Sequence, residues 1–296
     1  TDEHGFNNSK GLYNKNTVDI VLSGGSFAQG FDVKPNENIC AILRESGFNA
    51  ISIGMNGNGP LREFASLREY AKPLKPSIVL LSSAYGDLKD IGKAFQSKFL
   101  IQYFDDDGFE QNLILRQTEI DSVLVKYVRQ QYKRINESEV KIDRKMIEYH
   151  WFSQILKLYN TRKRFNLVPK SIFMINQDFD DERIIFKTII SKSKRMISSW
   201  EGKLYFIYIP LFDHATGNEL NPKFNLEYDY HKFILNLANE LNIPVIDIFK
   251  EVFNSHPDPA SLFPNRTEGH YNAKGFRLMA KAISNRLEAD RVFPSN

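Results

Sequence analysis

The sequence has little cysteine and no long apolar run. Its 296 residues hold a single cysteine, Cys40, which excludes an internal disulfide and a zinc site made of several cysteines. No apolar run approaches the roughly 18 residues that a membrane-spanning helix needs. Groups of His, Asp and Glu with the spacing of a metal site are also missing. We therefore expect no metal and no cofactor.

The sequence also lacks a strong excess of charge. Its 39 Lys and Arg against 36 Asp and Glu leave a net charge of +3, too small to favour nucleic acid or an anionic membrane as a partner. The one basic cluster consists of Lys126, Arg129, Lys133 and Arg134. Without the basic–aromatic motif of a nucleic-acid module, this cluster indicates the solvated face of a helix more than a phosphate-binding face.

A buried strand near the start of the chain runs into a glycine turn. Val18, Ile20, Val21 and Leu22 are apolar and partly β-branched, and the turn Gly24-Gly25-Ser26 follows Ser23. Open α/β sheets place their sites at the carboxyl ends of central strands, where the Ser26 hydroxyl and amide can both face a crevice. The alternative is that Ser26 only caps the next helix, and this stretch alone leaves both open.

Near the other end of the chain, His270 lies on a loop just before an amphipathic helix predicted over residues 273–287. A lone histidine is more often a surface or core residue than a base. A serine after the first strand and a histidine before the last helix, however, are the two halves of a nucleophile–base pair.

Together these motifs resemble the SGNH/GDSL hydrolase family. Gly24-Gly25-Ser26 matches the family's first block except at Gly25, where the family has Asp. Asn56-Gly57-Asn58-Gly59-Pro60 resembles its second block, and His270 its last. The resemblance covers roughly residues 1–90 and 200–290 and implies an acyl-ester hydrolase fold.

Strand and helix patterns alternate along most of the chain. The expected strands cover residues 18–22, 49–53, 77–81, 204–209 and 244–248, and the expected helices cover 36–46, 61–70, 182–198, 228–241 and 273–287. This alternation predicts parallel βαβ units. With the resemblance, it predicts one SGNH-like domain over residues 1–296, a flavodoxin-like three-layer α/β/α sandwich.

Residues 88–165 interrupt this rhythm and predict a helical insertion. They contain long helical patterns at 114–135 and 142–159. Functional insertions accumulate in loops at the edge of such sheets, so we expect this segment over or beside the site. Residues 171–175 predict a short strand or an extended link.

Ester hydrolysis assigns a role to each of these site residues. Ser26 is the candidate nucleophile and His270 the candidate base. The backbone amides of Ser26 and Gly57 would form the oxyanion hole, because a glycine lets its N–H approach the substrate closely.

Two further positions depart from the family pattern. Gly86 stands where the family's third block has an Asn that donates to the oxyanion, and Asn56 or Asn58 are possible substitutes. Thr267 stands where the family has its acid, three residues before His270. Glu268 or Asp258 can orient the histidine instead; otherwise the site is a Ser–His dyad steadied by a backbone carbonyl.

Other polar residues carry less weight. Asp213 and His214 follow a strand and can line the site, although we favour a loop role. His231 lies on a predicted helix and is expected to be structural, and His150 beside Trp151 is explained by packing.

The resemblance implies serine-dependent hydrolysis or transfer of an acyl group, often acetyl, on a carbohydrate or cell-envelope substrate. One alternative is a catalytically degenerate binding module, which the departures at Gly25, Gly86 and Thr267 favour. Another is an acyltransferase partnered with a membrane protein. The chain opens at Thr1, and residues 1–8 are similar to the segment that follows a membrane anchor in such relatives. We therefore expect an extracytoplasmic domain with an upstream anchor.

Overall fold

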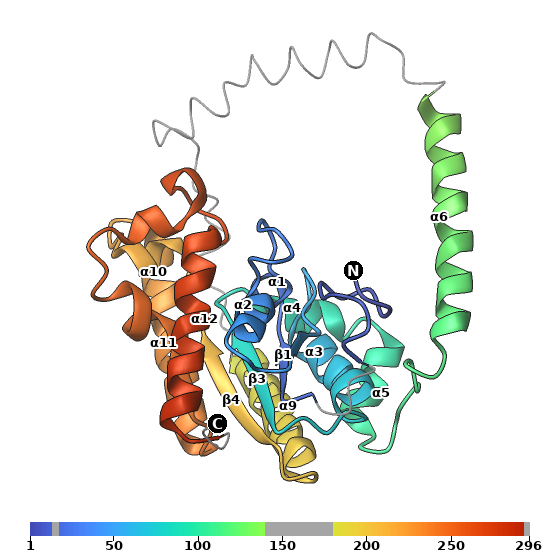
Figure 1. Ribbon diagram of the computed structural model, residues 1–296, viewed down its shortest axis with the longest axis horizontal. Helices are drawn as coiled ribbons and strands as arrows, with labels where there is room; N and C mark the ends of the chain where they lie inside the picture. The colour runs from blue at the N-terminus through green and yellow to red at the C-terminus, as the bar shows by residue number, and fades with distance from the viewer. Residues whose placement is uncertain (14–17, 140–179, 293–296) are drawn as a thin grey trace. The chain divides into compact units, whose positions relative to one another are not determined.

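Five parallel strands form one sheet in the order β2-β1-β3-β4-β5 (Figure 1). These strands are β1 (Ile20–Ser23), β2 (Ala50–Ser52), β3 (Ile78–Ser83), β4 (Lys203–Tyr208) and β5 (Val245–Asp247). The order reverses between β1 and β3, and in open parallel sheets the crevice at such a switch point, outside the carboxyl ends of the strands, holds the site. The parallel sheet predicted from the sequence is confirmed.

This computed structural model describes residues 1–13, 18–139 and 180–292. The chain divides into two compact units. One consists of Thr1–Ile114 with Phe179–Asn296, and the other of Leu115–Asp178. The helix predicted over residues 142–159 and the segment at 171–175 lie outside the described residues.

Alternate residues of the strands supply two separate cores. Ile20 and Leu22 face the layer made by α2 (Ile39–Glu45) and α12 (Ala273–Ala289), whose apolar side chains are buried with them. Figure 1 shows α2 and α12 on the same side of the strands. The strand period of two explains why each face is continuous.

The opposite face of the sheet is covered by a second helical layer. Val21 and Val79 pack there against α4 (Asp87–Ala94), α9 (Asp180–Ser198), α11 (Pro222–Glu240) and the π-helical turn η1 (Leu67–Ala71). η1 continues α3 (Pro60–Ser66). The three-layer α/β/α sandwich is thereby confirmed.

The first part of the predicted insertion belongs to the main unit. α4 and α5 (Lys98–Asp105) bury Ala94 and Tyr103 in a cluster with Leu61, Phe64 and Ile189. The second compact unit begins at Leu115, so α4 and α5 pack with the main unit. Beyond Leu115, α6 (Gln117–Glu139) is helical, as the pattern predicts. Lys126, Arg129, Lys133 and Arg134 are exposed there.

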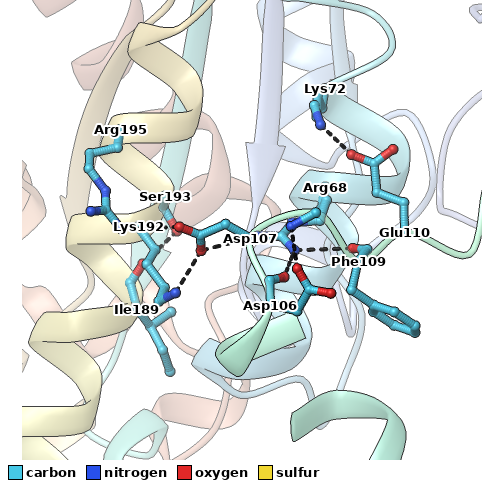
Figure 2. Close-up of polar contacts among 11 residues, drawn as sticks. Arg68, Lys72, Asp106, Asp107, Phe109, Glu110, Ile189, Lys192, Ser193 and Arg195 are labelled. Carbon is cyan, nitrogen blue, oxygen red and sulfur yellow. Dashed lines mark hydrogen bonds and ion pairs between the residues drawn. The ribbon is translucent and has the colours of Figure 1, made fainter. Parts of the chain in front are cut away.

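Within the main unit, ion pairs hold the loop that follows α5 against η1 and α9. Figure 2 shows Asp107 between cations of two elements. Its carboxylate lies 2.6 Å from Lys192 Nζ of α9 and 3.9 Å from Arg68 of η1. Arg68 is buried and donates to the carbonyls of Asp106 and Phe109 at 2.7 and 3.1 Å. A buried guanidinium with two carbonyl acceptors fixes this loop.

The C-terminal half contains several short elements. They are α10 (Phe212–Thr216), η3 (Phe249–Phe253), η4 (Pro259–Leu262) and η5 (Pro264–Arg266). Among the described residues, no helix has the length and apolar character needed to cross a membrane.

Candidate active site

The turn after β1 needs a glycine at its first position. Gly24 has φ +152°, and a Cβ built on it would lie 1.9 Å from the Ser82 Oγ on β3. No L side chain fits that backbone without strain. The turn sends the chain at once into α1 (Ser26–Gln29). Ser26 is therefore the first residue of a short helix at the carboxyl edge of the sheet.

Ser26 and His270 are joined by a hydrogen bond. Ser26 Oγ lies 2.6 Å from His270 Nε2, as expected from their places in the sequence. The imidazole packs against the rings of Phe27 and Phe31, with centroids 4.9 and 5.1 Å away. Two apolar rings limit the rotation of the imidazole, so the hydrogen bond is held in place.

The neighbours of His270 in the chain explain why it reaches this position. The Tyr271 ring is fully buried, and its hydroxyl donates to the Pro210 carbonyl at 2.6 Å. Asn272 caps α12 by accepting from the Gly275 amide at 3.1 Å. An anchored aromatic and a helix cap on adjacent residues fix the backbone beside the histidine.

The other ring nitrogen of His270 contacts the carboxylate of Asp32. Its Oδ2 lies 3.1 Å from His270 Nδ1. Asp32 follows the left-handed residue Gly30 and itself has φ +67°, a conformation that Asp tolerates better than most residues. Sequence reasoning missed Asp32, because no motif or spacing marks a carboxylate that the chain returns to the site through a turn.

The acids proposed from the sequence have other partners. Asp258 forms an ion pair with Arg266 at 2.7 Å, and Glu268 forms one with Lys223. The Thr267 hydroxyl donates to the Pro264 carbonyl at 3.2 Å. The structure therefore corrects the expectation that Glu268, Asp258 or a backbone carbonyl orients His270. Asp32 takes that place.

A pocket of about 350 Å³ opens beside the serine and the histidine. Its lining combines backbone of glycine-rich loops with polar and apolar side chains. The lining residues are Gly25, Ser26, Phe27, Asn56, Gly57, Asn58, Ser82, Ala84, Gly86, Asp87, Asp90, Ile209, Leu211, Phe212, Glu268, Gly269 and His270. Of the residues considered for the site from the sequence, Gly25, Ser26, Asn56, Gly57, Asn58, Gly86, Glu268 and His270 line it, whereas Asp213, His214, Asp258 and Thr267 do not.

The donors expected for an oxyanion are available in this pocket. Gly57 has φ +78°, and within the described part of the chain neither its amide nor that of Ser26 donates to another group. The side-chain amides of Asn56 and Asn58 are likewise without a protein partner among the hydrogen bonds of the described residues. Gly86 lines the pocket without a side chain.

Acidic groups lie along one wall of the pocket. Asp87 Oδ2 accepts hydrogen bonds from the Ser83 hydroxyl at 2.7 Å and the Ala84 amide at 3.0 Å. Burial raises the pKa of Asp87 to about 7, and the neighbouring Asp90 adds to this rise. Glu63, which is buried and does not line the pocket, also has its pKa raised well above the usual value by burial. Desolvation disfavours the charged form of a carboxyl.

The other histidines of the described chain lie outside this pocket. His214 is buried on α10, where its Nδ1 lies 2.7 Å from the Tyr208 hydroxyl. His231 Nε2 on α11 lies 2.8 Å from Asp247 Oδ2, which agrees with a structural role. His150 and Trp151 lie outside the described residues. No group of three His, Cys, Asp or Glu side chains in the described ranges can hold a metal ion.

Asp213 is buried on α10 as well. Its carboxylate accepts from the side chains of Asn218 and Asn221 at 2.8 and 2.9 Å. It does not line the pocket, whereas the neighbouring Phe212 does. Asp213 therefore does not line the site, as favoured from the sequence, but it lies on the short helix α10 and not in a loop.

Comparisons with known proteins find similarity in the fold but not in the sequence. The sequence matches no protein-family model and none of the curated proteins. The structure is similar to a protein assigned to the lipolytic G-D-S-L family from Desulfitobacterium hafniense DCB-2, with a TM-score of 0.50 and 12% identity over 91% of this chain and 99% of that one. The fold is that of the SGNH/GDSL hydrolases.

Two other solved structures are similar to the chain at lower TM-scores. A lipase/acylhydrolase from Enterococcus faecalis has a TM-score of 0.49 and 13% identity, over 94% of this chain and 98% of that one. A member of the G-D-S-L family from Veillonella parvula DSM 2008 has a TM-score of 0.47 and 14% identity, over 90% and 96%. Few residues are shared with any of the three.

Proposed function

We propose that the protein is a serine-dependent acyl-ester hydrolase with Ser26 as nucleophile, His270 as base and Asp32 as the acid that orients the base. One observation carries the proposal: the continuous hydrogen-bonded line from Ser26 Oγ through His270 to Asp32, with contacts of 2.6 and 3.1 Å. A nucleophile, a base and an oriented third group within hydrogen-bond reach define this chemistry.

The proposed mechanism gives each proton a direction that these two contacts support. With His270 Nδ1–H donating to Asp32, Nε2 is free to accept the Ser26 proton as Oγ bonds to the acyl carbon. The carbonyl π pair moves to oxygen, where the amides of Ser26 and Gly57 are available as donors. When the ester C–O bond breaks, the alkoxide takes the proton from Nε2. A water, or an acceptor hydroxyl, then attacks the acyl-enzyme by the same route in reverse.

We propose a short acyl group, such as acetyl, on a hydroxyl-rich alcohol such as a carbohydrate. The volume of about 350 Å³ is near the lower end for ligand pockets and suits a short chain more than a lipid. Asn56, Asn58 and Asp90 line it with groups that hydrogen-bond hydroxyls. Transfer in place of hydrolysis requires only that a second hydroxyl replaces water, and a membrane partner for it remains a prediction from the sequence, as do the extracytoplasmic location and the anchor.

The test compares hydrolysis of an aryl acetate by the purified protein and by Ser26→Ala. We expect the variant to lose at least about 100-fold in kcat/KM. A fluorophosphonate probe should label the wild type and not the variant. Equal background rates in both, with unchanged circular dichroism and no labelling, would favour the degenerate binding module. Replacing the aryl acetate with acetylated xylan and with a long-chain aryl ester then tests the substrate class.

A further inference from the structure

The donor that the SGNH pattern places at the third block is missing at Gly86, but the next residue brings a carboxyl group to the same wall. Gly86 precedes α4, and Asp87 is the first residue of that helix. Both line the pocket together with Ser26 and Gly57. Asp87 therefore has the position from which a side chain at the end of β3 can meet a group bound to Ser26.

We propose that Asp87 acts as a neutral carboxylic acid and donates a hydrogen bond to the oxyanion that forms on Ser26. This inference rests on the proposed serine-hydrolase function and adds a catalytic residue to it. A protonated carboxyl serves as an oxyanion donor when its surroundings keep it neutral, and its O–H would replace the missing side-chain amide.

The hydrogen bonds of Asp87 leave one oxygen for this task. Oδ2 accepts from the Ser83 hydroxyl and the Ala84 amide, at 2.7 and 3.0 Å. The Ser83 hydroxyl in turn lies 2.6 Å from the Tyr230 hydroxyl, which can donate to it. Among the described residues, Oδ1 of Asp87 accepts no hydrogen bond. It is also not among the fully buried polar atoms that lack a partner, so it is accessible from the pocket side. Two donors at Oδ2 make it the carbonyl oxygen of the acid and leave the proton to Oδ1.

Burial and the neighbouring Asp90 favour the neutral form of Asp87, and they outweigh the hydrogen bonds from Ser83 and Ala84, which favour its charged form. Asp90 on α4 is one turn away, and Glu63 on α3 is buried with an unpaired Oε1. Tyr230 on α11 adds a hydroxyl, and burial raises its own pKa well above the usual value. No cation is among the groups that shift the pKa of Asp87, whose value near 7 follows from burial and from Asp90. The acid form is therefore well populated at neutral pH.

The experiment is a pH–rate profile of kcat/KM on an aryl acetate, for the wild type, Asp87→Asn and Asp87→Ala. The wild type should lose activity on the alkaline side of neutral pH, as Asp87 loses its proton. Asp87→Asn keeps a donor that does not titrate, so the alkaline fall should disappear while at least a tenth of the maximal rate remains. Asp87→Ala should lose about 100-fold below pH 7, the usual effect of removing one oxyanion donor, and less above it, where the wild type has lost the same donor by ionisation.

Two further variants separate this role from a structural one. Asp90→Asn removes a neighbouring negative charge and should move the alkaline fall to lower pH. Glu227→Gln removes another carboxyl whose pKa burial raises to about 7, and it should leave the fall in place because Glu227 does not line the pocket. Circular dichroism checks folding throughout.

The outcomes distinguish this inference from the proposed function. If Asp87→Asn keeps the alkaline fall, or loses as much activity as Asp87→Ala, while Ser26→Ala is inactive, then Asp87 is not the donor and the serine hydrolase stands. If Ser26→Ala is as active as the wild type, the proposed function itself is wrong.

Discussion

Asp32 and His270 are 238 positions apart in the chain, yet the aspartate carboxylate lies 3.1 Å from the imidazole Nδ1. Ser26 Oγ lies 2.6 Å from Nε2, the other nitrogen of the same ring. Both partners of the histidine therefore come from one short stretch after β1, on either side of the left-handed Gly30. A single turn therefore positions both the proposed nucleophile and the proposed orienting acid.

Asp32→Asn should reduce kcat/KM on an aryl acetate by about 100-fold or more, because an amide at this position no longer stabilises the imidazolium and favours the wrong tautomer. Asn tolerates the φ of +67° at this position as well as Asp does, so the fold should be unaffected. Glu268→Gln and Asp258→Asn are the matched controls, and both should keep the tautomer and most of the activity. A loss confined to Glu268→Gln or Asp258→Asn would contradict the assignment of Asp32.

Gly24→Ala should destabilise the protein by about 2 kcal/mol or more, since the new Cβ combines a strained φ with a collision. The φ of Gly24 is +152°, and the Cβ would meet Ser82 Oγ at 1.9 Å. Gly86→Ala is the control, because a Cβ there meets nothing within 4 Å and the backbone is right-handed helical. Urea denaturation measures both, and equal midpoints for the two variants would show that the turn is not strained.

The strands, most of the helices and the two residues Ser26 and His270 could be predicted from the sequence, for identifiable physical reasons. Apolar periodicity marks a strand or helix wherever its buried face is regular, as in β1 and α12. Ser26 and His270 were visible because each borders a regular element. Asp32 was not, because loop conformation and not periodicity brings it to the histidine. The boundary at Leu115 was hidden as well, because the amphipathic pattern of α4 and α5 does not say which layer they pack on.

Glu227→Gln should stabilise the protein at pH 8 and have little effect near pH 4. Burial raises the pKa of Glu227 from 4.5 to about 7, so between these values the folded state holds a proton that the unfolded state has lost. The wild-type free energy of unfolding therefore falls as pH rises through this window. The amide oxygen of the new glutamine side chain can still accept from the His214 amide, a bond of 2.9 Å in the wild type.

Thermal unfolding at pH 5, 6, 7 and 8 tests this linkage. The difference in Tm between Glu227→Gln and the wild type should grow steadily from pH 5 to 7 and then level off. Glu219→Gln, at an exposed position, is the control and should follow the wild type. A constant difference across the series would mean that Glu227 ionises alike in both states.

Gly86→Asn should restore the side-chain amide that the SGNH pattern has at this position. The substitution has room, since a Cβ on Gly86 meets nothing within 4 Å and the residue has φ −66°. Its effect depends on Asp87. In an Asp87→Ala background we expect a gain of at least about tenfold in kcat/KM, because one oxyanion donor is worth about 100-fold or more.

In the wild-type background, the gain from Gly86→Asn should be small below pH 7 and larger above it, where Asp87 has lost its proton. Gly92→Asn is the matched control: it places the same side chain on α4, also in open space, and outside the pocket. Gly92→Asn should leave kcat/KM unchanged at every pH. A gain from Gly86→Asn that is the same at every pH and independent of residue 87 would mean that the amide and the carboxyl do not serve the same oxyanion.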